Sequence, residues 1–177
     1  MRHYVPLSVL KMVYFAIIHP HLNYCITTWG GASNSNLLPL FRLQKKIIRI
    51  ITFSPYTSHS APIFHDLKVL PLDLIYKYNL GLTFYKINNN LTTTGSHHLT
   101  PLNNIHNHQT RLSTNQNFFQ TFNKIKIGQS TYSSQGLQFW RKIPPNIKTL
   151  SFLSFKYKLK KHLFKILEHI MMDNWYK

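Results

Sequence analysis

LLPLFRLQKKIIRIIT, residues 37–52, is the stretch that decides the predicted fold. Wound as an α-helix at about 100° per residue, it separates into an apolar face and a basic face. Asn36 or Ser35 is expected to cap the helix, which places Pro39 in the first turn, where a missing N–H does little harm. The apolar face spans roughly half of the circumference and comprises Leu37, Leu40, Phe41, Leu43, Ile47, Ile48, Ile50 and Ile51.

The basic face of this helix carries no acidic residue. Its cations stand at positions i, i+3, i+4 and i+7, and are Arg42, Lys45, Lys46 and Arg49. A solvated helix face normally mixes glutamate with lysine, because mixed charges form i,i+4 pairs and limit self-repulsion. A polyanionic partner is therefore favoured over a merely solvated surface.

The charge of the whole chain points the same way. Among 177 residues, 21 are Lys or Arg and four are Asp or Glu, which gives a net charge of +17. Because 44% of the residues are hydrophobic, the chain has enough apolar material to fold. Such an imbalance indicates nucleic acid first and an anionic membrane surface second.

Helical periodicity recurs along the rest of the chain, so the predicted fold class is mainly α. Besides 36–52, long helices are expected near 7–29, 71–88 and 151–169, with Pro20 interrupting or kinking the first. The middle, near 91–117, is rich in Asn, Thr, His and Ser and reads as a loop. The segment Phe118–Ile127 contains FFQTF and KIKI, which allow a short β-hairpin. The last helix should bury Phe152, Phe155, Leu159, Leu163 and Ile166 and carry lysines on its surface.

Several kinds of chemistry have little support in the sequence. Cys25, as a single cysteine, excludes an internal disulfide and a zinc site built on cysteine pairs. Two-metal phosphoryl transfer needs converging carboxylates, whereas Asp66 and Asp73 read as residues near helix starts. The remaining histidine-rich loop is expected to be solvated rather than metal-binding, and it contains His97, His98, His106 and His108. No catalytic residue, metal or cofactor is expected.

The longest apolar run near the start of the chain, Met12–Ile18, is too short to span a bilayer. The sequence also lacks the flanks and cleavage site of a signal peptide. We expect a nuclear or cytoplasmic protein that is not secreted.

Several short motifs carry a resemblance to a known family. Tyr14–Tyr24 follows the pattern Y-x-x-x-I-x-P-x-L-x-Y, Trp29-Gly30 comes next, and residues 43–49 read L-Q-K-x-x-x-R. In this order they resemble the region just after the polymerase core in non-LTR (LINE-type, jockey-like) retrotransposon reverse transcriptases. Further matches are Thr110-Arg111, Gln135-Gly136, Trp140, Ile143-Pro144, Ile147-Lys148, Ser154-Phe155-Lys156, Leu159-Lys160 and Leu163.

The resemblance implies a helical thumb followed by a C-terminal extension, whose helices contact the template–primer duplex. It suggests a thumb-like region at 1–90, a loop-rich linker at 91–130 and a C-terminal helical region at 131–177. The paired aspartates of the palm are absent, so a non-catalytic C-terminal fragment of an RNA-directed DNA polymerase is implied. Cys25 stands where many relatives have glycine.

Two classes of function stay open at this point. The first is a nucleic-acid-binding module for an RNA–DNA hybrid or duplex, working beside the missing fingers and palm. The second is a decayed transposon remnant, or a basic helical module for a membrane or protein, without selected activity. Trp140 reads as a core residue rather than a stacking residue. The residues predicted to contact nucleic acid are Arg42, Lys45, Lys46, Arg49, Arg111, Lys156, Lys160 and Lys161.

Overall fold

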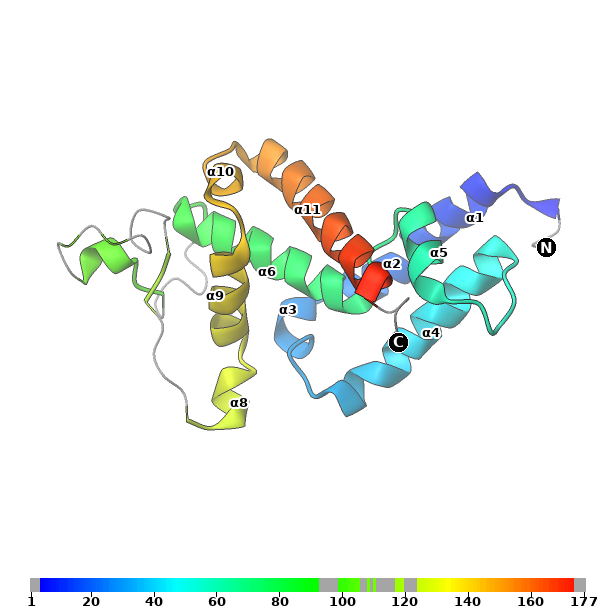
Figure 1. Ribbon diagram of the computed structural model, residues 1–177, viewed down its shortest axis with the longest axis horizontal. Helices are drawn as coiled ribbons and strands as arrows, with labels where there is room; N and C mark the ends of the chain where they lie inside the picture. Colours follow the sequence, from blue (N-terminus) through cyan, green and yellow to red (C-terminus); the bar gives the residue numbers. More distant parts are fainter. Residues whose placement is uncertain are drawn as a thin grey trace. The chain divides into compact units, whose positions relative to one another are not determined.

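The computed structural model describes residues 4–92, 99–105, 108, 110, 117–119 and 124–173. In these ranges the regular structure is helical, and the sole β pairing is an isolated antiparallel bridge between Pro101 and Phe118. This confirms the mainly α prediction (Figure 1). The helices are α1 (Leu7–Val13), η2 (Tyr14–Ile18), α2 (His19–Asn23), α3 (Ile26–Trp29), α4 (Asn34–Thr52), α5 (Ser60–Asp66), α6 (Leu72–Asn88), η4 (Leu102–Asn104), α8 (Lys126–Gln129), α9 (Tyr132–Lys142), α10 (Pro145–Lys148) and α11 (Phe152–Asp173).

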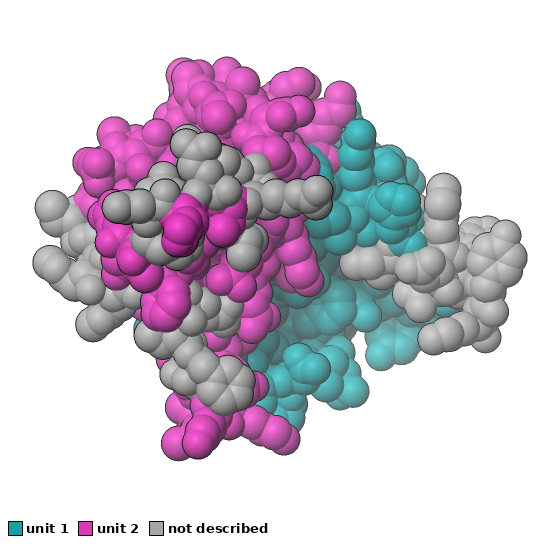
Figure 2. All heavy atoms as spheres, turned by 60° about the vertical axis from the view of Figure 1, so that its left-hand side comes forward, with its two compact units in different colours: residues 1–76, 162–177 teal, residues 77–161 magenta. Residues whose placement is uncertain are grey.

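The chain divides into two compact units. Unit 1 comprises residues 1–76 and 162–177, and unit 2 comprises residues 77–161 (Figure 2). These units do not coincide with the three regions expected at 1–90, 91–130 and 131–177, because the unit boundary falls within α6 and within α11.

Pro20 is accommodated by a widened helical turn. The segment η2 is a π-helix, in which the His19 N–H bonds to the Tyr14 carbonyl five residues earlier. A proline in regular α-helix clashes with the preceding turn, and here the turn that precedes Pro20 is a π turn rather than a regular α turn. The helical run therefore continues through Pro20 and stops at Asn23.

The predicted helix over 7–29 is instead broken after Asn23. Cys25 has φ 48°, in the left-handed region, and α3 begins at the next residue. Gly30 ends α3 against the ring of Tyr76, and a Cβ on Gly30 would lie 2.5 Å from that ring. The close approach of Tyr76 thus requires glycine at position 30.

α4 begins earlier and buries a narrower face than the sequence predicts. Its N-cap is Ser33, whose side chain makes no capping bond, so the predicted caps at Ser35 and Asn36 are wrong and Pro39 lies inside the helix. Its buried side chains are Gln44, Ile48 and Ile51. Three predicted core residues are exposed, namely Leu40, Leu43 and Ile50.

The buried side of α4 centres on a polar residue, Gln44, which is 1% exposed. Its Nε2 donates to the Tyr14 hydroxyl (2.9 Å) and to the Leu70 carbonyl (3.0 Å). Its Oε1 accepts from the N–H of Leu72 (2.9 Å), the first residue of α6. Gln44 therefore satisfies an N–H at a helix start and joins three segments of unit 1.

Unit 2 is built on an aromatic core. Phe84 lies 5.9 Å from Phe118 and 6.3 Å from Trp140 between ring centroids, and Tyr85 stacks on Phe155 at 4.3 Å. Trp140 is fully buried, which confirms its interpretation as a core residue. The predicted hairpin over 118–127 is not confirmed: Lys126 begins α8, and residues 120–123 lie outside the described part.

We expect Gln44→Leu to lower the free energy of unfolding by about 2–4 kcal/mol, because it leaves three buried polar groups without a partner. Urea unfolding followed by helical circular dichroism measures this. Lys46→Leu is the control, since Lys46 is exposed on the same helix and its replacement should change stability by no more than about 0.5 kcal/mol. Equal effects of the two substitutions would contradict the role of Gln44.

Cys25→Gly should raise the free energy of unfolding by about 0.5–1 kcal/mol, because the left-handed backbone costs an L-residue more than it costs glycine. Cys25→Ala keeps the Cβ and should bring no such gain. Thermal unfolding of both variants decides the point, and an equal loss of stability in the two would show that the backbone at position 25 is unstrained.

Candidate nucleic-acid interface

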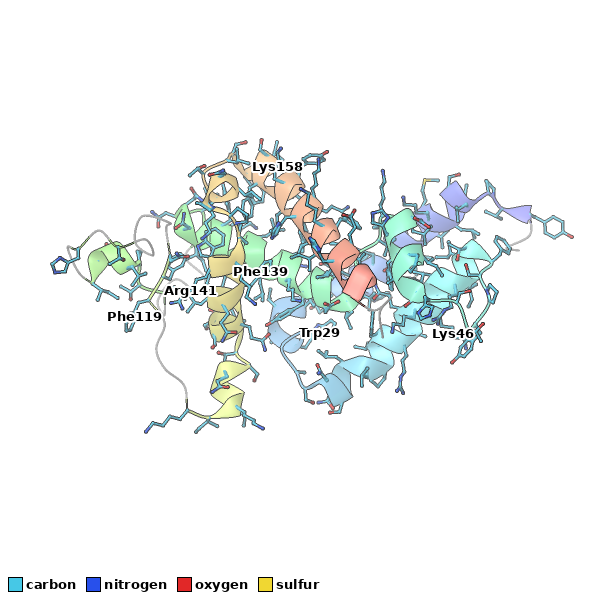
Figure 3. All side chains as sticks on the ribbon, viewed as in Figure 1. Trp29, Lys46, Phe119, Phe139, Arg141 and Lys158 are labelled. Carbon is cyan, nitrogen blue, oxygen red and sulfur yellow. The ribbon has the colours of Figure 1, made fainter. Side chains whose placement is uncertain are left out.

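The four predicted cations of α4 differ in their surroundings. Arg42 and Lys46 are exposed, and Figure 3 labels Lys46. Lys45 is half-buried, with its Nζ 4.2 Å from the centroid of the Phe41 ring. No described carboxylate forms an ion pair with any of these four cations.

Arg49 is engaged within unit 1. Its Nε and Nη2 both donate to the Ser58 carbonyl, at 3.0 and 2.8 Å, and its guanidinium lies 5.7 Å from the Tyr56 ring. The side chain thus holds the loop that follows α4. While this contact persists, the two donors that face Ser58 are not available to a phosphate, so Arg42 and Lys46 are the stronger candidates.

Neighbouring cations of α4 act on Lys45. The pKa of Lys45 is lowered, first by partial burial and then by the charges of Arg49 and Arg42. Like charges disfavour the protonated lysine, and a bound anion would relieve this repulsion. The face therefore has the electrostatics of an anion-binding surface.

Charge is divided unevenly between the two units. Residues 77–161 contain 12 of the 21 Lys and Arg residues and none of the Asp and Glu residues. All four carboxylate side chains belong to unit 1. The larger uncompensated charge therefore lies in unit 2, outside α4, and includes the predicted contacts Lys156, Lys160 and Lys161.

α11 exposes the second set of predicted contacts. Its core side chains recur every four residues, as Phe155, Leu159, Leu163 and Leu167, so the predicted stripe is confirmed at its three central positions. Phe152 and Ile166 are only half-buried. Lys156, Lys160 and Lys161 are exposed, as is Lys158, and they spread over a broad arc rather than one narrow row.

Arg111 lies outside the described residues, as do His97, His98 and His106. In the part of the chain that the structure does describe, no group of three or more His, Cys, Asp or Glu side chains is placed to hold a metal ion. No helix there is long and apolar enough to cross a bilayer.

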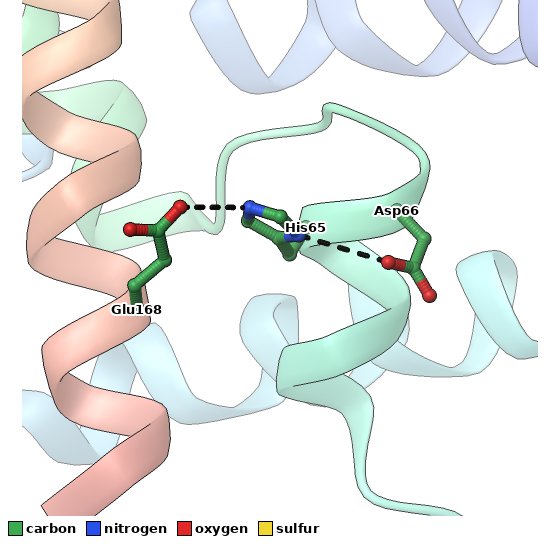
Figure 4. Close-up of polar contacts among 3 residues, drawn as sticks. All are labelled: His65, Asp66 and Glu168. Carbon is green, nitrogen blue, oxygen red and sulfur yellow. Dashed lines mark hydrogen bonds and ion pairs between the residues drawn. The ribbon is translucent and has the colours of Figure 1, made fainter.

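The two carboxylates considered in the sequence, Asp66 and Asp73, lie on different helices. Asp66 is the last residue of α5, so its predicted place near a helix start is wrong, and Asp73 stands in the first turn of α6. His65 lies between two carboxylates, with its Nε2 3.0 Å from Glu168 and its Nδ1 3.6 Å from Asp66 (Figure 4). No sequence pattern predicted the pair of His65 and Glu168, which are 103 residues apart.

Lys148 is a basic residue that the fold uses internally. It is 3% exposed, its Nζ donates to Asn117 Oδ1 at 3.1 Å, and it lies 4.9 Å from the centroid of the Trp140 ring. Burial lowers the pKa of Lys148 to about 8. This lysine therefore contributes to the core of unit 2 and not to its surface.

Comparison with protein-family models gave no match, and neither the curated proteins nor the solved structures include a significant match to this chain.

Lys148→Met should alter the pH dependence of stability. The native pKa of Lys148 is lowered to about 8 from the ordinary 10.5. Below pH 8 the native state therefore contains a buried charge, which reduces the free energy of unfolding. Between these two values the unfolded chain holds more protons, and wild-type stability rises with pH. The advantage of the methionine variant, about 1–3 kcal/mol at pH 7, should therefore shrink as pH rises from 8 to 10.5.

Urea unfolding of the wild type and of Lys148→Met at several pH values measures the difference between their free energies of unfolding. The titration of other groups cancels in this difference. A difference that stays constant with pH would show that Lys148 keeps its ordinary pKa.

Proposed function

We propose that this chain binds nucleic acid through backbone phosphates, as the thumb and C-terminal extension of a non-LTR retrotransposon reverse transcriptase would. The observation that carries the proposal is the exposed pair Arg42 and Lys46 on α4, which form no ion pair with a carboxylate among the described residues. The opposite side of the helix is held by Gln44, so these cations keep a defined direction. The partner is an RNA–DNA hybrid or duplex in the nucleus or cytoplasm.

The motifs behind the resemblance have physical roles that support the proposal. Tyr14 and Gln44, which stand in two different motifs, share a buried hydrogen bond. Gly30 meets Tyr76 closely, and Cys25 adopts a backbone conformation that favours the glycine found in many relatives. A chain with these features would hold a thumb-like arrangement of helices within unit 1.

Binding of this kind is independent of base sequence. Lys and Arg contacts to phosphate release counterions, so affinity falls steeply with salt. The chain would act beside the fingers and palm of a parent polymerase and would not itself extend a primer, because no carboxylate pair for Mg²⁺ was found among the motifs.

A second candidate is a basic helical interaction module, including one left by a decayed transposon. The exposed Leu43 and Ile50 of α4 favour it, since their positions on the helix lie beside the basic face and add apolar surface there. A protein partner would use these side chains, whereas phosphates would not.

The double variant Arg42→Gln/Lys46→Gln should weaken binding to a generic RNA–DNA hybrid and flatten the slope of log K against log salt by about two. Glutamine is a comparable helix former, so α4 should persist. Fluorescence anisotropy over a range of salt concentrations measures both quantities.

The matched control is Lys68→Gln/Lys165→Gln, which removes the same charge from exposed positions of unit 1 that are not part of α4. Equal losses in the two double variants would indicate a general charge effect, and an unchanged slope in the first would remove the support for α4 as the interface. Leu43→Gln distinguishes the two candidates. It removes apolar surface that a protein partner would use, and it should leave the affinity for nucleic acid unchanged.

A further inference from the structure

The outer side of α11 carries an exposed aromatic ring. Tyr157 is 68% exposed and Leu153, one turn earlier, is 77% exposed. Both point away from Phe155 and Leu159, which are fully buried, because residues two apart on a helix differ by about 200°. No other described ring stacks on Tyr157.

Four exposed lysines surround this ring. Lys160 and Lys161 lie one turn further along the same side, and Lys156 and Lys158 flank Tyr157 on its two sides. The nearest carboxylate in the sequence is Glu168, about three turns further along α11, where it contacts His65. An aromatic ring is therefore set among four exposed lysines, with the nearest carboxylate of the helix about three turns away.

We propose that Tyr157 is a stacking platform for an unpaired nucleobase, and that the flanking lysines bind the adjacent phosphates of a single strand. Proteins that bind single strands combine aromatic rings with a basic surface in this way. A duplex offers its phosphates to the lysines but keeps its bases stacked inside. The inference rests on the proposed function and adds a single-stranded ligand to it.

Charge complementarity and the small apolar area favour this ligand over a membrane. A helix that lies in a lipid interface buries a broad apolar face, and that face of α11 is already buried through Phe155, Leu159 and Leu163. Among the described side chains of α11, the large exposed hydrophobic ones are Leu153 and Tyr157. One ring among four ammonium groups matches a base with its phosphates better than it matches acyl chains.

The test uses the full chain and three probes: a uridine oligomer of about 12 nucleotides, within the roughly 4–16 that such sites cover, the same oligomer without bases, and an RNA–DNA duplex. Tyr157→Ala should weaken binding of the base-containing single strand about 5- to 100-fold and leave the duplex and the baseless strand unchanged. Tyr157→Trp keeps an aromatic surface and should retain the affinity.

The matched control is Tyr24→Ala, an equally exposed tyrosine with no Lys or Arg within ten residues of it in the chain. It should bind all three probes as the wild type does. Ultraviolet crosslinking of a 5-iodouridine oligomer should label the peptide that contains Tyr157.

The outcomes separate the two proposals. If the wild type binds neither single strands nor duplex, the proposed function fails and this inference fails with it. If the wild type binds both but Tyr157→Ala loses nothing on the single strand, only the stacking platform is overturned. A loss confined to binding of phosphatidylserine vesicles would identify the same surface as a membrane contact and would also overturn it.

Discussion

The arrangement of unit 1 depends on one buried amide. Gln44 bonds to the Tyr14 hydroxyl, the Leu70 carbonyl and the Leu72 N–H, so its helix can adopt only the rotation that meets all three. A shift of one residue along α4 would turn the amide by about 100° and leave these three groups without their hydrogen-bond partner. An uncharged side chain thereby determines where the charged ones point, and the direction of Arg42 and Lys46 follows from it.

The fold tolerates an unusual charge imbalance by separating roles among its cations. Two cations make contacts within the fold. Arg49 donates hydrogen bonds to the Ser58 carbonyl, and Lys148 contacts the side chains of Asn117 and Trp140. The lysines of α11 and two cations of α4 stay at the surface, where water screens their repulsion. Because exposed cations repel one another, a polyanion that binds them would stabilise the folded chain by linkage.

The sequence predicted the long helices well and their contacts poorly. Periodicity placed helices at 36–52, 71–88 and 151–169, close to the observed 34–52, 72–88 and 152–173, since long amphipathic or apolar runs leave little choice of structure. It assigned Leu40, Leu43 and Ile50 to the core because periodicity gives an angular position but not which arc a neighbour covers. The Gln44 bonds, the Arg49 clamp on Ser58 and the contact of His65 with Glu168 depend on tertiary structure, which no local pattern encodes.

The uneven division of carboxylates has a consequence in acid. Acid unfolding arises largely from protonation of carboxylates that the native state holds in favourable contacts. Residues 77–161 contain no Asp or Glu, so a fall in pH toward 3 can add protons there only to histidine. The carboxylates that contact His65, Glu168 and Asp66, both belong to unit 1. Protonation of carboxylate side chains can therefore change the charge of unit 1 alone, whereas the aromatic core around Trp140 belongs to a unit without such side chains.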